Sequence, residues 1–286
     1  MKLSLKICFI FFITNQIINS NINENLPKEK HNKNNFVTVS FNKGMSNSPR
    51  FNLKKIKHNE KYKILKELFH KHVIDNPQYS DTPKTPKIIH QIWLGNNGKL
   101  PEKYKTFQKT WLENHPDWKY MLWTEKEIEE FGLINKAQYD EIDNYGYKSD
   151  LARYEIIYRI GGLYVDTDFE CIKPFDYLHH ICDFYTGAHF RATSIYNGLI
   201  AAAPGHPVLL ECINSIKKQG QKKDTSPGFF TQCFFKAIKS HSGPSVALPV
   251  NYVYPWPCWD RHKKNPTKWI RNESIAIHHW FESWVK

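Results

Sequence analysis

The sequence lacks the short motifs that identify several common enzyme classes. It contains no Walker phosphate-binding loop, no GxGxxG dinucleotide motif, no HExxH metalloprotease motif and no GxSxG nucleophile motif. Zinc-finger spacing, RNP-like strings and basic recognition helices are also missing, so we expect no nucleic-acid partner. The functional site must therefore be sought in other patterns.

Long apolar runs are missing too. Lys2 and Lys6 accompany an apolar run at residues 7–13, which is shorter than the roughly 20 residues of a membrane-spanning helix. Such a segment is typical of a secretory signal peptide, and we expect one over residues 1–20. Because residues 18–20 form only a mediocre cleavage site, a short uncleaved signal anchor is the alternative, and it is the only membrane attachment that we expect. Either assignment directs the chain to the secretory pathway, to a Golgi-type lumen or to secretion.

Cysteine is scarce. Six cysteines occur, and Cys8 lies in the leader, which leaves an odd number with no CxxC pair. This pattern argues against a zinc site and leaves at least one thiol free. One or two disulfides could form in an oxidising compartment, with their pairing left open.

Positive charge is concentrated at the N-terminal end. The net charge is +12, and the first 80 residues, with 14 Lys and Arg against 5 Asp and Glu, carry +9 of it. The basic excess therefore says little about the substrate of the remaining chain.

The first 80 residues also differ in composition from the rest. Residues 21–80 are mostly rich in Asn and Lys, which predicts a disordered stem or linker with one short helix near residues 62–73. A proline-containing boundary follows at residues 81–86. We expect the folded domain over residues 81–286, where the hydrophobic and aromatic content is ample for a core.

The most informative stretch spans residues 148–168. Ser149 or Asp150 can cap the start of a helix, because a short side-chain oxygen accepts an unpaired amide hydrogen of the first turn. Apolar and aromatic residues then follow helical spacing until Gly161 and Gly162, which end the helix. The next three residues are apolar strand formers, so a short strand delivers two carboxylates at its end.

Asp166 and Asp168 are these carboxylates. Residues two apart on an extended chain face the same way, so both side chains can address one centre. Close like charges repel, and a divalent metal that carries phosphate oxygens would remove this penalty. Asp150 and Arg153 lie three apart on the preceding helix, and the Tyr164 hydroxyl adds a further polar group. The alternative is a surface turn with two solvated aspartates.

The string SDLARYEIIYRIGGLYVDTD resembles the sugar-nucleotide site of the DxD glycosyltransferases of family 32. This family includes yeast α-1,6-mannosyltransferases, inositol-phosphoceramide mannosyltransferases and α-1,4-galactosyltransferases. The string is also similar to the glucosyltransferase domain of large clostridial toxins. The resemblance implies a single-domain α/β fold of the GT-A-like kind that binds a nucleotide sugar, with a central mixed sheet flanked by helices.

Two other segments carry the same resemblance. Residues 86–95 match the start of the family fold, which implies that Trp93 stacks on the nucleotide base, with a core tryptophan as the alternative. Asn197 lies where family members have an asparagine near the transferred sugar, with a turn asparagine as the alternative. His90 and His206 are interpreted as structural histidines.

The C-terminal segment resembles the A-x-H-x-x-x-x-S-W end of family members. The resemblance implies that His278 or His279 supplies a further ligand or phosphate contact at the metal. It also implies a hydroxyl contact from Ser283 and a lid over the diphosphate from Trp284. Imidazole is a softer ligand than carboxylate, so a histidine beside Asp168 would favour manganese over magnesium. Bulky residues at positions 281 and 282 depart from many relatives and leave the register open, and two surface histidines in a frayed tail are the alternative.

The resemblance implies a metal-dependent transferase that moves a hexose from a UDP- or GDP-sugar to a hydroxyl acceptor, with retention at the anomeric carbon. In this interpretation Asp168 holds the cation, and Asp166 contacts the ribose and metal-bound water. Asp150 and Arg153 hold the sugar hydroxyls and the phosphate side, and Tyr164 adds one hydrogen bond.

The acceptor and two other classes of function stay open. The acceptor could be a glycan, a glycolipid or a protein side chain, and the aromatic segment at residues 250–256 could form a wall of its site or part of the core. A non-catalytic sugar-nucleotide or glycan-binding module is the second hypothesis. A metal-dependent diphosphate hydrolase is the third.

Overall fold

The computed structural model describes residues 36–218, 224–263 and 265–281. The expected signal segment over residues 1–20 therefore lies outside the described residues, as do Ser283 and Trp284. Within the described ranges, no helix combines the length and the apolar character that a membrane crossing requires. The five cysteines in these ranges all carry free thiols.

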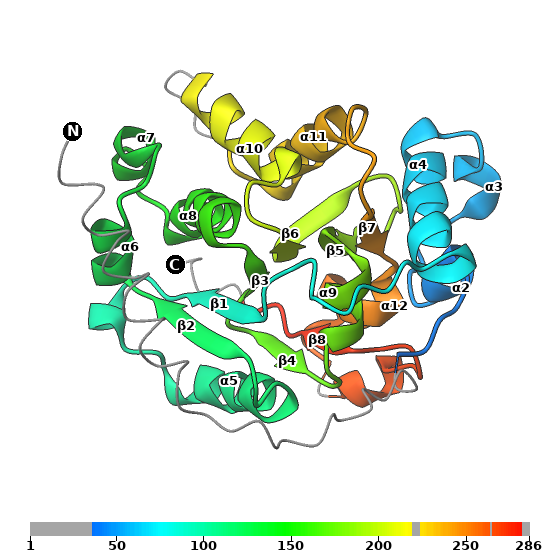
Figure 1. Cartoon of the computed structure of the whole chain (residues 1–286). Helices are drawn as coiled ribbons and strands as arrows, with labels where there is room; N and C mark the ends of the chain where they lie inside the picture. Colours follow the sequence, from blue (N-terminus) through cyan, green and yellow to red (C-terminus); the bar gives the residue numbers. More distant parts are fainter. Residues whose placement is uncertain (1–35, 219–223, 264, 282–286) are drawn as a thin grey trace, which may run out of the picture. The chain divides into compact units, whose positions relative to one another are not determined.

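A mixed six-stranded sheet forms the centre of the domain, with strand order β2-β1-β3-β6-β5-β7 (Figure 1). Its strands are β1 (Ile88–Ile92), β2 (Lys119–Trp123), β3 (Gly162–Val165), β5 (Phe184–Ala188), β6 (Ile195–Ala202) and β7 (Ser245–Leu248). β1 runs parallel to β2 and β3, β6 runs antiparallel to β3 and β5, and β5 runs parallel to β7. The prediction of an α/β fold with a central mixed sheet flanked by helices is confirmed.

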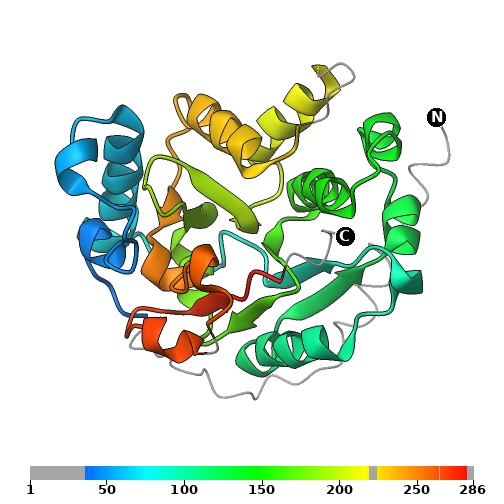
Figure 2. The ribbon, with the colours of Figure 1, turned by 180° about the vertical axis from the view of Figure 1, so that it is seen from behind.

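Helices cover both sides of this sheet. In Figures 1 and 2, α8 (Tyr145–Ile160), α10 (Pro207–Lys218) and α11 (Pro227–Ala237) lie on one side, and α5 (Glu102–Asn114) lies on the other. The other described helical elements that follow β1 in the chain are α6 (Glu125–Phe131), α7 (Lys136–Asp140), α9 (Asp176–Ile181) and α12 (Val250–Val253), with the 3-10 helices η3 (Asn96–Gly98), η4 (Cys258–Asp260) and η5 (Pro266–Trp269). α11 packs on β6, and α10 packs on both α8 and α11.

A second, two-stranded sheet pairs distant parts of the chain. β4 (Phe169–Cys171) follows the two aspartates, and β8 (Ala276–His278) runs antiparallel to it near the C-terminal end. The register places Phe169 opposite His278. This pairing brings the C-terminal histidines to the end of the aspartate turn.

Helix α8 begins earlier than the sequence predicts. The side chain of Asn144 accepts a hydrogen bond from the Tyr147 amide and caps the helix one turn before Ser149. Ser149 and Asp150 are therefore inside the helix, where their side chains are free for other contacts. The predicted end is correct, because Gly161 has φ 73° and stops the helix.

Residues 36–80 differ from the expected disordered linker. They form α2 (Phe41–Gly44), α3 (Leu53–Ile56), α4 (Glu60–Phe69) and the π-helical segment η2 (His70–Asp75). Phe41, Leu65 and Phe69 are fully buried, and α4 packs against β7. The few apolar residues of this polar segment recur three and four positions apart, so one helix face is apolar and joins the core.

Candidate active site

A cavity of about 410 Å³ opens beside the ends of β1, β3 and β6, next to α8. Most of the predicted site residues line it, namely Trp93, Asp150, Arg153, Tyr164, Asp166, Asp168, Asn197 and His278. These side chains come from five parts of the chain. The cavity is therefore the candidate active site.

The two aspartates are brought together by a turn after β3. The Asp166 amide donates to the Gly198 carbonyl at 2.8 Å, which extends the pairing of β3 with β6. The Phe169 amide then donates to the Asp166 carbonyl at 3.1 Å and closes the turn. The carboxylates share one centre as predicted, but an extended chain is not the reason.

His278 lies against Asp168. Its Nε2 is 2.9 Å from Asp168 Oδ1 and 3.9 Å from Asp166 Oδ2. The other oxygen of Asp168 accepts the Phe281 amide at 2.8 Å. Burial alone would raise the pKa of Asp168, but the interaction with His278 and the hydrogen bond from Phe281 outweigh it and lower the pKa. Asp168 is therefore held in its ionised form.

His279 points to a different place. Its Nε2 lies 2.9 Å from Glu170 Oε2, and its ring stacks on Phe107 at 4.3 Å. Successive side chains on an extended segment point to opposite faces, so His278 and His279 cannot both reach the aspartates. Of the two histidines proposed from sequence, the structure brings only His278 to this centre.

Arg153 connects the helix to the aspartate turn. Its Nη2 lies 3.1 Å from Asp150 Oδ1 and 3.2 Å from Asp166 Oδ1, and its Nη1 donates to the Asn197 carbonyl at 2.7 Å. The guanidinium also stacks 4.3 Å from the centre of the Tyr164 ring. Only 4% of Arg153 is exposed, so it supplies a buried positive charge between the buried Asp150 and the partly exposed Asp166.

Asp150 and Asn197 form a second polar contact. The Asn197 amide donates to Asp150 Oδ1 and to the Tyr154 hydroxyl, both at 2.9 Å. Burial raises the pKa of Asp150 to about 7, although Arg153 acts in the opposite direction. Burial also raises the pKa of Asp166, and Arg153 offsets this only in part. Tyr164 donates its hydroxyl to Asp166 Oδ1 at 2.7 Å, so it orients that carboxylate.

Trp93 lines the cavity at the end of β1. Its ring lies 4.8 Å from the Tyr104 ring, and its buried Nε1 has no hydrogen-bond partner in the part of the chain that the structure describes. His90 on the same strand is fully buried, between the Gly161 carbonyl and the Trp123 indole N–H, both at 3.0 Å. His90 faces the core and does not line the cavity.

Three aromatic side chains also line the cavity, namely Tyr196, Tyr254 and Trp280, and the Tyr196 and Tyr254 rings lie 4.6 Å apart. From sequence, residues 250–256 stay open between a wall of the acceptor site and part of the core, and Tyr196 and Trp280 are not assigned to the site. The Trp280 ring is 4.1 Å from the ring of His278. The sequence feature that could have assigned Tyr254 to the site is the aromatic composition of residues 250–256. For Trp280 it is the position directly after the two histidines.

Asp166, Asp168 and His278 have the chemistry of a divalent-metal site. Each offers one ligand atom, and these atoms all lie within 4.8 Å of one another. A Cβ at residue 198 would lie 2.6 Å from Asp166 Oδ2, so Gly198 keeps the space beside this carboxylate open. Two carboxylates and one imidazole suit Mn²⁺ or Mg²⁺, and the imidazole favours Mn²⁺. The residues therefore fit a metal.

Part of the chain matches known proteins. Residues 101–185 match the family described as glycosyltransferase sugar-binding region containing DXD motif. Inositol phosphoceramide mannosyltransferase 3 of Schizosaccharomyces pombe is 36% identical over 140 residues, which cover 46% of this chain and 37% of that protein. Inositol phosphoceramide mannosyltransferase 1 of the same yeast is 30% identical over 191 residues, which cover 61% of this chain and 59% of that protein.

A solved structure of PaToxG glycosyltransferase is also similar. It has a TM-score of 0.47 and 18% sequence identity, and the match covers 65% of this chain and 79% of that chain. The present chain matches less than two thirds of the length of either yeast relative.

The matched region 101–185 contains Asp150, Arg153 and both aspartates of the turn. In this α/β domain the matched region lies at the ends of the central strands, and it is similar to the sugar-binding region of glycosyltransferases that carry a DxD motif. The matches confirm that the chain resembles the DxD glycosyltransferases of family 32.

Proposed function

We propose that the protein is a divalent-metal-dependent, retaining glycosyltransferase that moves a hexose from a UDP- or GDP-sugar to a hydroxyl acceptor. The observation that carries this proposal is the meeting of Asp166, Asp168 and His278 in a cavity that also holds Arg153. A bound Mn²⁺ or Mg²⁺ would stabilise the negative charge that develops on the departing diphosphate. Retention rests on the resemblance to the family.

The residues of the cavity have separate tasks in this proposal. Asp166, Asp168 and His278 hold the ion, and Arg153 supplies a fixed positive charge for the phosphate side of the donor. The side chains of Asp150 and Asn197 contact each other. The Asp150 carboxylate accepts hydrogen bonds from the sugar hydroxyls, the Asn197 amide donates and accepts them, and together they orient the anomeric carbon. The acceptor proton passes to the departing phosphate, so no separate base is required.

The nucleotide base packs against Trp93 in this proposal. The indole lies at the cavity edge and its Nε1 has no partner among the described residues, so it can serve both as a stacking surface and as a donor. The rings of Tyr196, Tyr254 and Trp280 suit the apolar faces of a sugar acceptor.

The acceptor class follows from the relatives. Their names describe mannosyl transfer to inositol phosphoceramide, so a mannose donor and a glycolipid acceptor are the first pair to test. A glycan or a protein side chain is the alternative acceptor. The signal segment expected over residues 1–20 supports a place in the secretory pathway, in a Golgi-type lumen or after secretion.

The test is donor cleavage by the purified full chain, with Mn²⁺ and a panel of UDP- and GDP-sugars that includes GDP-mannose, followed by mass spectrometry. We expect one donor to be cleaved, and Asp168→Ala to reduce the rate by several orders of magnitude. Asp143→Ala, at an exposed aspartate outside the cavity, is the matched control and should keep the parent rate.

Two outcomes would favour the other hypotheses. Metal-dependent donor binding with no cleavage, with every acceptor class supplied, would favour a binding module. Release of free sugar at a rate that no acceptor changes would favour a diphosphate hydrolase. Parent activity in Asp168→Ala would remove the metal site from the mechanism.

A further inference from the structure

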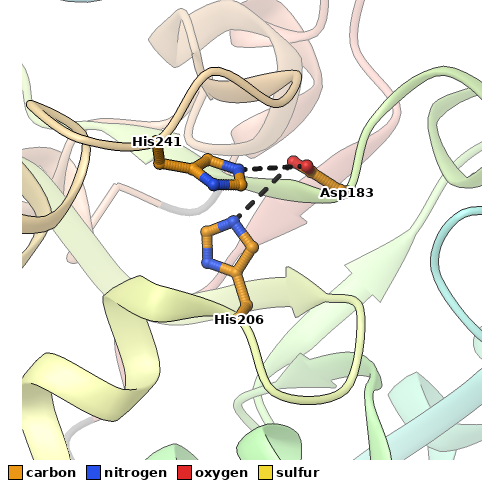
Figure 3. Close-up of side chains that lie close together, drawn as sticks. All are labelled: Asp183, His206 and His241. Atoms are coloured by element: carbon orange, nitrogen blue, oxygen red, sulfur yellow. Dashed lines mark hydrogen bonds and ion pairs between the residues drawn. The ribbon is translucent and has the colours of Figure 1, made fainter.

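A second cluster of metal-ligating side chains lies outside the cavity. Asp183, His206 and His241 converge from three segments, as Figure 3 shows. Asp183 precedes β5, His206 precedes α10, and His241 follows α11. The His241 Nε2 lies 3.1 Å from Asp183 Oδ2, and the His206 Nε2 lies 3.7 Å from Asp183 Oδ1.

This cluster is remote from the candidate active site. The Ala203 amide donates to the Asp183 carbonyl at 2.7 Å, so Asp183 lies beside the C-terminal end of β6. Asn197, which lines the cavity, is near the other end of this strand. A strand rises about 3.3 Å per residue, so the five residues from Asn197 to Ala202 separate the two places by about 17 Å. The two clusters therefore cannot share an ion.

Gly243 keeps the cluster open. A Cβ at this position would lie 2.0 Å from Asp183 Oδ2 and 2.5 Å from His241 Nε2. Gly243 is not among the glycines with positive φ, so its backbone does not require glycine. Glycine is needed at this position because a side chain would collide with these ligand atoms.

We propose that Asp183, His206 and His241 form a second metal site, which takes Zn²⁺ or a similar borderline-soft ion. Two imidazoles and one carboxylate suit such an ion better than Mn²⁺ or Mg²⁺, which the carboxylate-rich first centre suits. Water completes the coordination on the solvent side, where the side chains of Asp183 and His241 are 20% and 22% exposed.

The geometry is close to that of a four-coordinate ion. Ligands at about 2.0–2.1 Å from zinc are about 3.3 Å apart, and the Asp183–His241 and Asp183–His206 pairs are already near this separation. All three ligand atoms lie within 4.8 Å of one another, and His241, at 22% exposed, is less tightly enclosed than His206, at 2%. Binding therefore needs a shift of one side chain.

The imidazole of His206 must also change its tautomer when the ion binds. Its Nδ1 accepts the Val208 amide at 3.3 Å, so its Nε2 carries the proton and lies 3.1 Å from Ser245 Oγ. An ion at Nε2 replaces this proton, and Nδ1 becomes the protonated nitrogen. Two hydrogen bonds are then lost, the long one from the Val208 amide and the one between Nε2 and Ser245 Oγ, while the Ser245 hydroxyl still donates to Asp183 Oδ1 at 3.2 Å.

This site has a structural consequence for the domain. A bound ion would tie the start of β5 to the ends of the α10 and α11 segments, which are otherwise linked there by side-chain hydrogen bonds. The cysteine pattern argues against a zinc site, but that argument concerns thiolate ligands, and this cluster uses none. His206, interpreted as structural from sequence, here has a ligand role as well.

The experiment measures Zn²⁺ binding to the metal-stripped full chain, by competition with a chromophoric chelator. Asp168→Asn is the parent, because it disables the first centre and leaves the second intact. We expect the parent to bind one equivalent of Zn²⁺. Adding His241→Ala should weaken the affinity at least tenfold, and adding Gly243→Ala should do the same by filling the space.

Controls separate loss of the site from loss of the fold. His262→Ala removes an exposed histidine outside the cluster and should leave the affinity unchanged. Circular dichroism should give the parent spectrum for every variant, and Zn²⁺ should raise the Tm of the parent but not of the His241→Ala protein. X-ray absorption of the zinc form should show two imidazole nitrogens.

Either of two results would overturn the proposal. One is an Asp168→Asn protein that binds no Zn²⁺ at micromolar concentration. The other is unchanged zinc affinity in a folded His241→Ala protein. Because the readout is binding, the failure of this site would leave the proposed transferase activity untouched.

Discussion

Phe169 and His278 are paired across the two-stranded sheet, and their rings stack 4.4 Å apart. Phe169 follows Asp168 directly, so this one pair fixes the position of the His278 imidazole relative to the aspartate turn. A residue near the C-terminal end is thereby placed in a site built mostly by the middle of the chain. The strand pairing also decides that His278, and not the adjacent His279, lies beside the two aspartates.

The first prediction compares these histidines. His278→Gln should lower the rate of donor cleavage at least a hundredfold at limiting Mn²⁺, because the ion loses a ligand and Asp168 loses its partner. His279→Gln should stay within about threefold of the parent, since His279 contacts Glu170 instead. Mn²⁺ titrations of activity, with the two variants side by side, provide the measurement. Equal losses in both would contradict the register of β4 and β8.

The second prediction concerns the buried charge of Arg153. Arg153→Met should reduce the free energy of unfolding by about 3–5 kcal/mol at pH 8, because Asp150 and Asp166 lose their buried partner. Arg191→Met, at an exposed arginine, should change the free energy of unfolding by less than about 0.5 kcal/mol. Guanidinium denaturation measures both. A stable Arg153→Met protein would mean that the carboxylates are not desolvated as described.

The third prediction is a pH dependence from His90. Burial lowers the pKa of this histidine to about 4, against 6.5 when it is exposed. The unfolded chain therefore binds more protons between these values, and the stability from this group is present above about pH 6.5 and is lost as the pH falls towards 4. The loss amounts to about 3 kcal/mol.

Urea unfolding between pH 4 and pH 7 measures this effect. The slope of stability against pH should be smaller in His90→Gln than in the parent protein. His262→Gln, at an exposed histidine, should retain the parent slope. If the slope in His90→Gln equals that of the parent, His90 is not the group responsible.

The fourth prediction separates close packing from backbone strain. Gly162 has φ 104°, and a Cβ there would lie 2.7 Å from the Ile88 carbonyl oxygen, whereas Gly205 has φ 76° and nothing within 4 Å. Gly205→Ala should cost about 1 kcal/mol from backbone strain alone, and Gly162→Ala should cost at least twice as much. Thermal unfolding of both variants gives the comparison. Equal costs would argue against tight packing of β3 on β1.

Much of the fold and the site could be predicted because it is local. The helix end at Gly161 and the two aspartates lie within twenty residues of each other, and short-range spacing indicates such features. Arg153 and Asp150 follow from helical geometry in the same way. The prediction of a mixed sheet came from the family resemblance that these residues carry.

The parts that sequence could not settle depend on distant contacts. The choice between His278 and His279 depends on a strand pairing over more than a hundred residues, which no local pattern encodes. Asn144 caps α8 in place of the later Ser149 and Asp150 because it precedes the first helical turn. Composition also predicted a linker before residue 81, but a few well-spaced apolar residues suffice to fold helix α4 onto the core.

The position of Arg153 also has a consequence for whether folding requires a bound ligand. Its guanidinium lies between Asp150 and Asp166, so the chain itself supplies the positive charge that compensates the repulsion between these two carboxylates. The chain can therefore complete its folding before it meets either an ion or a donor. Under the proposed function, the binding of the metal and of the nucleotide sugar is then a separate and reversible step.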